Sequence, residues 1–317
     1  MNIVNLLNNH SYTAFSFEIL PPLKGNNFSK VCAIIDKLQE FDPKYINITT
    51  HHSEFIYKGR GNGMLEKINI RKRPGTVAIA AAIQTRYKIP AVPHIMCKGF
   101  TKEETEYALI DLQYLGVSDL LLLRGDTNKL EKDHVDPAKC HEHATDLIRQ
   151  VNLFNQGIDL EENTFEKPEN PFSYGVACYP EKHEEAPNME SDMYFLKQKI
   201  ALGAEYAVTQ MFFDNRKYFD FVARCRQEGI TVPIIPGIKP IVFMDQLTVL
   251  PKVFRSEIPE TLAHELRKCK TNEATKQVGI EWGIGQCKEL IRFGVPSLHF
   301  YTLMATDSVR NIAKEIY

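Results

Sequence analysis

The sequence predicts a single α/β domain over residues 1–317, folded as a (β/α)8 barrel of the TIM type in which parallel strands alternate with helices. The run Asp-Leu-Leu-Leu-Leu at 119–123 cannot alternate between core and water, so we expect helices to cover that strand on both faces. Strand-like and helix-like segments alternate along nearly the whole chain, as parallel strands with helical crossovers require. The 317 residues also accommodate the roughly 250 residues of such a barrel. A doubly wound open sheet is the alternative.

The first half of the chain contains four expected strands, each followed by a helix. The first strand places Phe15 and Phe17 on one face and Glu18 on the other. A capping box, Thr101 with Glu104, opens the helix after the third strand, because the hydroxyl and the carboxylate bind backbone donors that are otherwise free. The expected strands are 14–20, 45–50, 91–97 and 119–128, and the expected helices are 29–40, 76–87, 101–115 and one through 144–154.

The second half continues the same alternation after an interruption. Residues 157–171 are acidic and contain prolines, and we expect a surface loop there rather than a linker, because the alternation resumes afterwards. The expected strands are 172–178, 205–211, 232–236 and 297–303, and the expected helices are 192–203, 215–228, 242–253, 259–270 and 273–293. The total is eight strands, the number that closes a barrel of this class.

The composition favours a protein that acts on small molecules. A formal net charge of −2 with 25% charged residues argues against a nucleic-acid partner. The chain has neither a cationic leader nor a membrane-length apolar run, so we expect a cytoplasmic protein without a membrane partner. Seven cysteines without a Cys-x-x-Cys pair indicate reduced thiols rather than disulfides. We expect no metal site, because His51 and His52 are adjacent, and His141 and His143 lack a carboxylate at ligand spacing.

Polar residues gather at the predicted strand ends, which a barrel brings together on one face. Each residue alone is equally consistent with a cap or a structural donor. Glu18 is more informative, because phenylalanines and prolines surround it, and poor solvation raises a carboxyl pKa toward the range useful for proton donation. A structural pair with an arginine or lysine is its alternative role. The strand-end residues are Glu18, Thr49, His94, Arg124, Asp126, Tyr179, His183 and Gln210.

Eight segments in order resemble methylenetetrahydrofolate reductases, and specifically the catalytic barrel of the short bacterial form. They span nearly the whole chain, which makes chance similarity improbable. No Gly-x-Gly-x-x-Gly turn is present, so a dinucleotide would not be held as in an open sheet. The segments are Phe17-Glu18 with Pro21-Pro22, Val92-Pro93-His94, Leu123-Arg124-Gly125-Asp126, Ala177 to His183, Lys199 to Ala204, Thr209 to Asp214, Pro236-Gly237-Ile238 and His299 to Leu303.

The resemblance implies an FAD enzyme of one-carbon metabolism and methionine biosynthesis. It implies a ping-pong reaction in which hydride passes from NADH or NADPH to the flavin and then to 5,10-methylenetetrahydrofolate, giving 5-methyltetrahydrofolate. The residues do not decide between the two nucleotides. We expect a homo-oligomer.

The resemblance also implies residue roles. Glu18 would be the general acid that helps to open the folate ring, and Asp126 would stabilise positive charge between flavin and pterin. Gln210 would bind the pterin, and Gln246 matches a substrate-side position. The positions that match FAD contacts are Thr49, His94, Arg124, Gly125, Asp126, Ala144, Ala177, Tyr179, His183, Asp192 and Lys199, of which Arg124, His183 and Lys199 suit the diphosphate.

Two positions depart from the family pattern. Counting from Pro236-Gly237, Leu250 stands where a phenylalanine stacks on the substrate, and Ala305 stands where an arginine follows Tyr-Thr-Leu. Losing an aromatic contact costs about 1 kcal/mol and losing a charged hydrogen bond roughly 1.5–3 kcal/mol, so we expect weaker substrate binding but retained activity. A non-catalytic folate- or flavin-binding subunit is the alternative function, and a flavin-free barrel lyase that uses Glu18 is a third.

Overall fold

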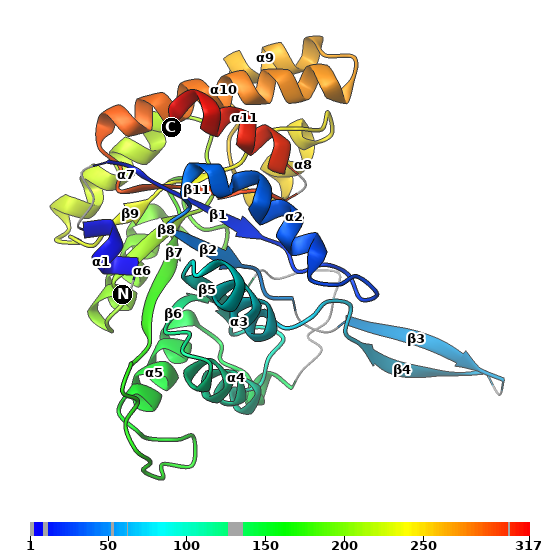
Figure 1. Cartoon of the computed structure of the whole chain (residues 1–317), viewed down its shortest axis with the longest axis vertical. Coiled ribbons are helices and arrows are strands. Elements are labelled where there is room, and N and C mark those ends of the chain that lie inside the picture. Colours follow the sequence, from blue (N-terminus) through cyan, green and yellow to red (C-terminus); the bar gives the residue numbers. More distant parts are fainter. Residues whose placement is uncertain (1–2, 9–11, 52–53, 62, 126–135, 304) are drawn as a thin grey trace. The chain divides into compact units, whose positions relative to one another are not determined.

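The strands of the main sheet follow one another in the order β10-β11-β1-β2-β5-β6-β7-β8-β9 (Figure 1). The structure is a computed structural model that describes residues 3–8, 12–51, 54–61, 63–125, 136–303 and 305–317. β1 pairs in parallel with β11, β5 with β6, and β7 with β8. The strands are β1 (Ala14–Ile19), β2 (Tyr45–Ile48), β5 (Ala91–Met96), β6 (Asp119–Leu123), β7 (Ser173–Cys178), β8 (Tyr206–Thr209), β9 (Ile234–Ile235), β10 (Gly237–Ile238) and β11 (Ser297–Tyr301).

The strand order closes on itself. β9 and β10 stand at the two ends of the order, yet only Pro236 separates them along the chain. Proline has no N–H to donate, so one extended segment is divided into two short strands. β9 pairs with β8, and β10 pairs with β11. The predicted barrel is therefore confirmed, with its seventh strand split at Pro236.

The helices occupy the predicted intervals with ends shifted by a few residues. The predicted capping box is confirmed, because Glu104 N–H donates to Thr101 Oγ1 over 3.0 Å and Thr101 N–H donates to Glu104 Oε2 over 2.8 Å. Helices α1 and α11 were not predicted. The helices are α1 (Ile3–Asn8), α2 (Ser29–Leu38), α3 (Thr76–Tyr87), α4 (Lys102–Tyr114), α5 (Ala144–Asn155), α6 (Met189–Ala201), α7 (Asn215–Gln227), α8 (Gln246–Phe254), α9 (Glu260–Lys268), α10 (Asn272–Phe293) and α11 (Thr306–Ile316), with 3-10 turns at Gln39–Phe41 and Pro137–Lys139.

The leucine-rich strand is buried as predicted. In β6, Leu120 and Leu122 have no exposed surface, and Leu121 on the opposite face is also buried. Both faces of the strand are therefore covered, as in a parallel sheet. The strand is shorter than predicted, since it ends at Leu123 and residues 126–128 lie outside the described part of the chain.

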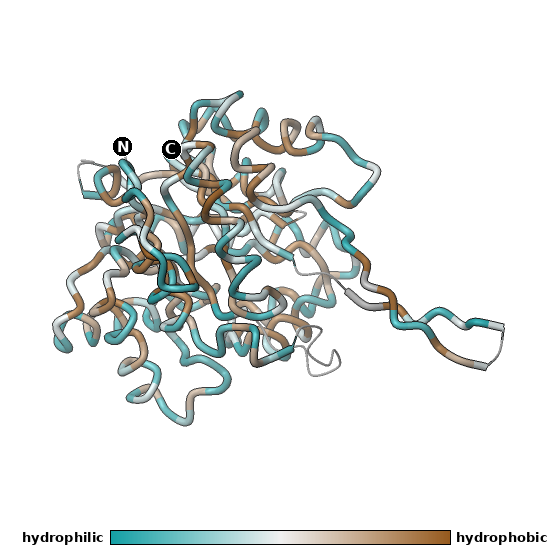
Figure 2. Tube along the Cα trace, turned by 90° about the horizontal axis from the view of Figure 1, so that it is seen from below, coloured by the Kyte–Doolittle hydropathy of each residue, from teal (hydrophilic) through white to brown (hydrophobic). Residues whose placement is uncertain are grey.

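A separate antiparallel hairpin was not predicted. It consists of β3 (Glu54–Arg60) and β4 (Met64–Ile70), which pair only with each other among the described strands and extend away from α3 and α4 (Figure 1). Apolar and polar residues mix along both arms (Figure 2). Tyr57 and Leu65 are about two-thirds exposed, at 65% and 67%. None of the side chains that the structure describes in the two arms is buried, so they do not form the buried apolar face from which a strand is normally recognised in a sequence.

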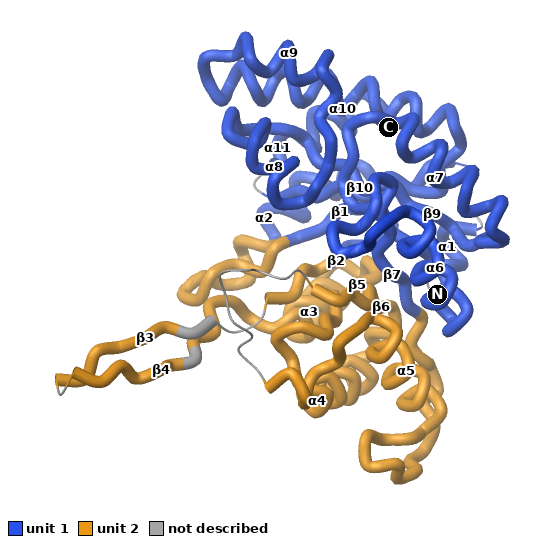
Figure 3. Tube along the Cα trace, turned by 180° about the vertical axis from the view of Figure 1, so that it is seen from behind, with its two compact units in different colours: residues 1–19, 32–47, 174–317 blue, residues 20–31, 48–173 orange. Residues whose placement is uncertain are grey.

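The chain divides into two compact units (Figure 3). Unit 1 comprises residues 1–19, 32–47 and 174–317, and unit 2 comprises residues 20–31 and 48–173. An aromatic group in unit 1 surrounds Phe15, whose ring lies 5.5 Å from Phe300, 5.7 Å from Phe41 and 5.6 Å from Tyr317, measured between centroids. This group fixes the face of β1 that lies opposite Glu18. The single domain remains a prediction.

Candidate active site

Glu18 lies near the end of β1 in unit 1. Phe15 and Phe17 occupy the other face of the strand, so the carboxyl points away from the aromatic group. The register pairs Glu18 with Tyr301 of β11, and the Thr302 hydroxyl donates a hydrogen bond to the Glu18 carbonyl. The backbone of Glu18 is thus held by the neighbouring strand, which fixes the direction of its side chain.

The Glu18 carboxyl is only 6% exposed, which makes its charged form costly. Burial raises its pKa from 4.5 to about 8, and the positive charge of Lys239 opposes that rise. At neutral pH the carboxyl therefore carries its proton. A buried, protonated carboxyl can donate that proton to a substrate, which is the property predicted for Glu18 from the sequence.

Lys239 follows β10 directly and is almost as buried as Glu18, at 7% exposure. Its ammonium donates to the carbonyl of Leu303 over 3.1 Å and to the carbonyl of Tyr301 over 3.4 Å. Burial lowers the pKa of Lys239 to about 8, and the charge of Glu18 opposes the fall. Sequence reasoning missed this residue. Its only signal was a lysine directly after the Pro236-Gly237-Ile238 segment.

The Tyr301 side chain extends from β11 across Gly237 of β10 and reaches the end of β8. Its hydroxyl donates to the Thr209 carbonyl at the end of β8 over 2.6 Å. The ring passes over Gly237, where a Cβ would come within 2.5 Å of it. Gly237 N–H in turn donates to Thr209 Oγ1 over 2.9 Å. The absence of a side chain at Gly237 is therefore what allows Tyr301 to link β11 with β8.

Five predicted FAD contacts form one connected group at β7 and α6 of unit 1. Lys199 Nζ donates to the Ala177 carbonyl over 2.7 Å. The His183 N–H donates to the Asp192 carboxylate over 2.9 Å, and the His183 ring meets the Tyr179 ring edge to face at 4.7 Å between centroids. Burial lowers the pKa of Lys199, while Cys178 and Asp192 oppose the fall. The structure thus brings together Ala177, Tyr179, His183, Asp192 and Lys199.

The two predicted substrate glutamines also lie in unit 1, and both are half-buried. Gln210 follows β8, and its Oε1 accepts the Met211 N–H over 2.9 Å. Gln246 begins α8, and its Oε1 accepts the N–H groups of Val242 and Phe243 over 2.7 and 3.1 Å. The oxygen of each side chain is therefore engaged by the backbone, which orients the amide NH2 as the donor of each glutamine.

In unit 2, Thr49 follows β2 and His94 lies within β5, near its end. The hydroxyl of Thr50, next to Thr49, donates to the His94 carbonyl over 2.5 Å and so connects the two strand ends. His94 is buried, and burial lowers its pKa to about 3, with His51 acting in the same direction. The imidazole is therefore neutral at physiological pH.

Arg124 and Gly125 follow β6 in unit 2, and Arg124 contacts the segment just before Ala144. Arg124 Nε donates to the Glu142 carbonyl over 3.2 Å, which places the guanidinium beside the segment that leads into α5. Ala144 is the first residue of that helix. Gly125 has a φ of +87°, a backbone conformation that favours glycine. A guanidinium beside a helix N-terminus is suited to a phosphate-bearing ligand.

Asp126 lies outside the described residues. Within the part of the chain that the structure describes, no group of three or more His, Cys, Asp or Glu residues could hold a metal ion. No described helix has the length and apolar character of a membrane span.

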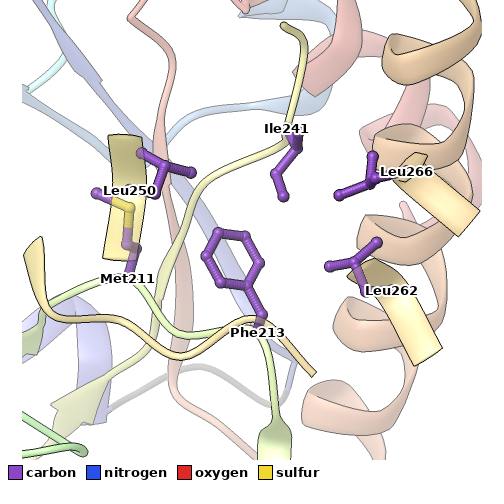
Figure 4. Close-up of a cluster of buried hydrophobic side chains, with 6 residues drawn as sticks. All are labelled: Met211, Phe213, Ile241, Leu250, Leu262 and Leu266. Atoms are coloured by element: carbon purple, nitrogen blue, oxygen red, sulfur yellow. The ribbon is translucent and has the colours of Figure 1, made fainter. Parts of the chain in front are cut away.

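Leu250 and Ala305, which depart from the family pattern, are both buried in unit 1. Leu250 is 3% exposed and packs against Met211, Phe213 and Ile241 in an apolar cluster completed by Leu262 and Leu266 (Figure 4). Ala305 is 2% exposed and precedes α11. Leu250 therefore contributes the buried face of α8 to a core that it shares with α9 and the segment after β8.

Comparisons with known proteins agree over nearly the whole chain. The family model of methylenetetrahydrofolate reductase matches residues 3–317. The 5,10-methylenetetrahydrofolate reductase of Escherichia coli K12 is 31% identical over 289 residues, which cover 91% of this chain and 85% of that protein. A probable methylenetetrahydrofolate reductase (NADPH) of Caenorhabditis elegans is 30% identical over 307 residues, which cover 95% of this chain and 42% of that protein.

The chain spans about half the length of the first animal and plant relatives that it matches, 42% and 48%. Among solved structures, an uncharacterized protein from Clostridium thermocellum, described as binding two copies of 5-methyl-5,6,7,8-tetrahydrofolic acid, aligns over 98% of both chains. Its TM-score is 0.57 and its identity 16%, a likeness that supports the barrel fold alone. From the family model and the bacterial relative together, the chain belongs to the methylenetetrahydrofolate reductase family.

Proposed function

We propose that this protein reduces 5,10-methylenetetrahydrofolate to 5-methyltetrahydrofolate with NADH or NADPH, and that it requires FAD. Membership of the family supports the reaction. The single observation on the structure that carries the proposal is Glu18, a buried carboxyl at the end of β1 whose pKa of about 8 keeps it protonated at neutral pH.

Glu18 is the proposed general acid. A proton passes from its carboxyl to a nitrogen of the five-membered folate ring, the carbon–nitrogen bond of that ring breaks, and an iminium carbon forms that can accept hydride. The carboxylate remains on the protein. Burial suits the residue to this role, because a carboxyl that is neutral near the operating pH both holds the proton and can release it.

The groups present fit FAD as the cofactor. Its diphosphate is anionic, so we propose Lys199 and His183 in unit 1, and separately Arg124 in unit 2, as residues suited to it, because nitrogen donors bind phosphate oxygens. When bound, FAD would supply the hydride relay between nicotinamide and folate. The remaining proposed contacts are Thr49, His94, Gly125, Asp126, Ala144, Ala177, Tyr179 and Asp192.

The proposed substrate contacts are the two glutamines. Gln210 and Gln246 each use Oε1 to accept backbone N–H groups, so the amide NH2 is the group that we propose donates to the folate. Asp126 keeps its proposed electrostatic role, in which a negative charge stabilises the cationic iminium. The homo-oligomer and the cytoplasmic location stay predictions.

Two half-reactions test the proposal. The protein, purified with FAD, is mixed anaerobically with NADH or NADPH, and flavin absorbance is followed. We expect the absorbance to bleach, and then to return when methylenetetrahydrofolate is added. A protein that takes up no FAD contradicts the proposal. Bleaching without return on addition of folate would favour the non-catalytic binding subunit instead.

A further inference from the structure

Lys239 and Glu18 reach the same residue from two strands that flank β11. The register pairs Gly237 with His299 and Ile238 with Phe300, so Lys239 continues that pairing toward Tyr301. On the other side of β11, Glu18 pairs with Tyr301 directly. Paired residues of parallel strands project to the same face of a sheet. Lys239, directly after β10, therefore lies beside Tyr301 of β11, which in turn pairs with Glu18 of β1, and all three belong to unit 1.

The Lys239 ammonium is held by backbone carbonyls. It donates to the carbonyls of Tyr301 and Leu303 over 3.4 and 3.1 Å, at the end of β11. An ammonium has three donors, and burying one is costly unless acceptors or a negative charge compensate. Two of the donors are directed at backbone carbonyls, and the nearby charge that acts on Lys239 is that of Glu18. The ammonium is therefore held in a fixed place, and its charge acts on the carboxyl.

We propose that Lys239 is a positioning residue for the acid, whose fixed ammonium stabilises the carboxylate that Glu18 becomes when it gives its proton to the folate nitrogen. The role rests on the proposed function. The proton leaves Glu18, the ring carbon–nitrogen bond takes its electrons to the protonated nitrogen, and the charge left on Glu18 lies beside a cation already in place. The ammonium does not have to move when the proton leaves Glu18. A charge that is already in place stabilises a newly formed buried charge most effectively.

Burial opposes the charged form of the tyrosines and the cysteine around Lys239 and Glu18 in unit 1. Tyr301 lies between the two charged residues, and burial raises its pKa well above 10. Tyr45, Cys178 and Tyr179 act on Tyr301, and burial raises the pKa of Tyr45 and of Cys178 as well. The His299 ring stacks on Tyr45 at 6.2 Å between centroids. Within unit 1, Lys239 is therefore the cation whose charge acts on Glu18.

Infrared difference spectroscopy measures this coupling without any reaction. The stretch of the protonated Glu18 carboxyl is assigned by its loss in Glu18→Gln and followed against pH in the FAD-loaded protein. We expect a midpoint near 8 in the wild type. In Lys239→Met, which keeps an unbranched side chain one atom shorter and removes the charge, the midpoint should rise by about 1 pH unit or more, because an opposite charge lowers a carboxyl pKa by roughly 1–3. An unchanged midpoint overturns the proposal.

Two further variants serve as controls. Lys239→Arg keeps a positive charge and should hold the midpoint within about half a unit of the wild type. Lys44→Met removes a largely buried lysine that pairs with Asp42 instead, and should leave the Glu18 midpoint unchanged. If Lys44→Met moves the midpoint as far as Lys239→Met does, the effect is not specific to Lys239 and the proposal fails.

A reciprocal measurement applies even if Lys239→Met does not fold. Coupling is mutual, so the isosteric variant Glu18→Gln should lower the pKa of Lys239, since Glu18 opposes the effect of burial there. The Lys239 signal is followed by nitrogen-15 NMR of lysine-labelled protein and assigned by its absence in Lys239→Arg. An equal pKa in the wild type and in Glu18→Gln overturns the proposal.

The kinetic consequence separates this inference from the proposed function. Lys239→Met should slow the folate half-reaction at least about 10-fold, leave FAD reduction by nicotinamide within about twofold, and move the alkaline limb of the folate step to higher pH. Equal slowing of both half-reactions overturns the positioning role. If no folate reduction occurs in the wild type, the proposed function fails, whereas the infrared and NMR titrations still decide whether Lys239 sets the proton of Glu18.

Discussion

The raised pKa of Glu18 depends on its neighbours in space, only some of which are its neighbours in the sequence. Its flanking phenylalanines lie on the other face of β1, which made a buried carboxyl predictable. The lysine that limits its pKa could not be predicted in the same way, because Lys239 approaches through the pairing of β10, β11 and β1 and not through sequence proximity. The sequence suggested a structural cation as the alternative partner of Glu18. The structure provides a cation that leaves the proton in place at neutral pH.

Glu18→Gln removes the proton donor while keeping the shape of the side chain. We expect the folate half-reaction to slow by about 10²–10⁴-fold, the usual contribution of a general acid, with FAD reduction by nicotinamide nearly intact. Single-turnover kinetics of each half-reaction measures the two effects separately. Glu66→Gln, on the exposed hairpin, is the matched control and should alter neither. Equal losses in both half-reactions would show that Glu18 is not the acid.

The raised pKa of Glu18 also makes stability depend on pH. Between its unfolded value of 4.5 and its folded value of about 8, the folded protein holds a proton that the unfolded chain releases, so this contribution to stability is lost as pH rises. Over this range the free energy of unfolding falls by at most about 1.4 kcal/mol per pH unit. Urea unfolding of Glu18→Gln and wild type at pH 5.5 and 7.5 measures it. The variant should gain stability relative to wild type at the higher pH, and a constant difference would contradict the assigned pKa.

At the scale of elements, the contact between β8, β10 and β11 depends on a missing side chain. Gly237→Ala places a Cβ against the Tyr301 ring and the Thr209 carbonyl, so we expect a loss of about 1–3 kcal/mol in the free energy of unfolding. Gly285→Ala, in α10, is the control, because a Cβ there meets nothing within 4 Å and alanine favours a helix. Chemical denaturation of both variants compares them. A tolerated Gly237→Ala would mean that the ring has room to move.

Two leucines of unit 2 differ in burial because one lies in a strand of the main sheet and the other in the hairpin. Leu122 in β6 has no exposed surface, whereas Leu65 in β4 is 67% exposed. Leu122→Ala should cost about 2–5 kcal/mol, because it removes buried methyl groups and leaves a cavity. Leu65→Ala should change stability by less than about 0.5 kcal/mol. Urea midpoints of the two variants test the contrast, and similar costs would indicate that the hairpin is packed against something.

The same contrast explains which elements were predictable. Strands such as β6 were predictable from unbroken apolar runs, and most helices from apolar residues at helical spacing, although the ends moved and α1 and α11 were missed. None of the hairpin side chains that the structure describes is buried, so the hairpin gives neither signal. Counting along the chain placed Leu250 at a family position without showing its surroundings, and the structure adds that it packs in the apolar cluster of α8.

For the whole molecule, the barrel could be predicted because alternation and chain length constrain it strongly. Its closure needed the structure, since only the strand order reveals that β9 and β10 are one strand split at Pro236. The sequence predicted the candidate site as a set of strand ends, among them Glu18 and His94, but not the neighbours that the structure gives them: Lys239 and Tyr301 beside Glu18 in unit 1, and Thr50 at the His94 carbonyl in unit 2. The two groups belong to separate compact units, so sequence alone could not say how either is built.

The central claim is that Glu18 gives its proton in an FAD-dependent reduction of methylenetetrahydrofolate. Anaerobic stopped-flow spectroscopy of the FAD-loaded protein, first reduced with NADH or NADPH and then mixed with methylenetetrahydrofolate over a range of pH, tests it most directly. The account predicts that flavin absorbance returns with formation of methyltetrahydrofolate, and that the rate falls as pH rises through about 8, where Glu18 loses its proton. Reduced flavin that methylenetetrahydrofolate does not reoxidise at any pH would contradict it.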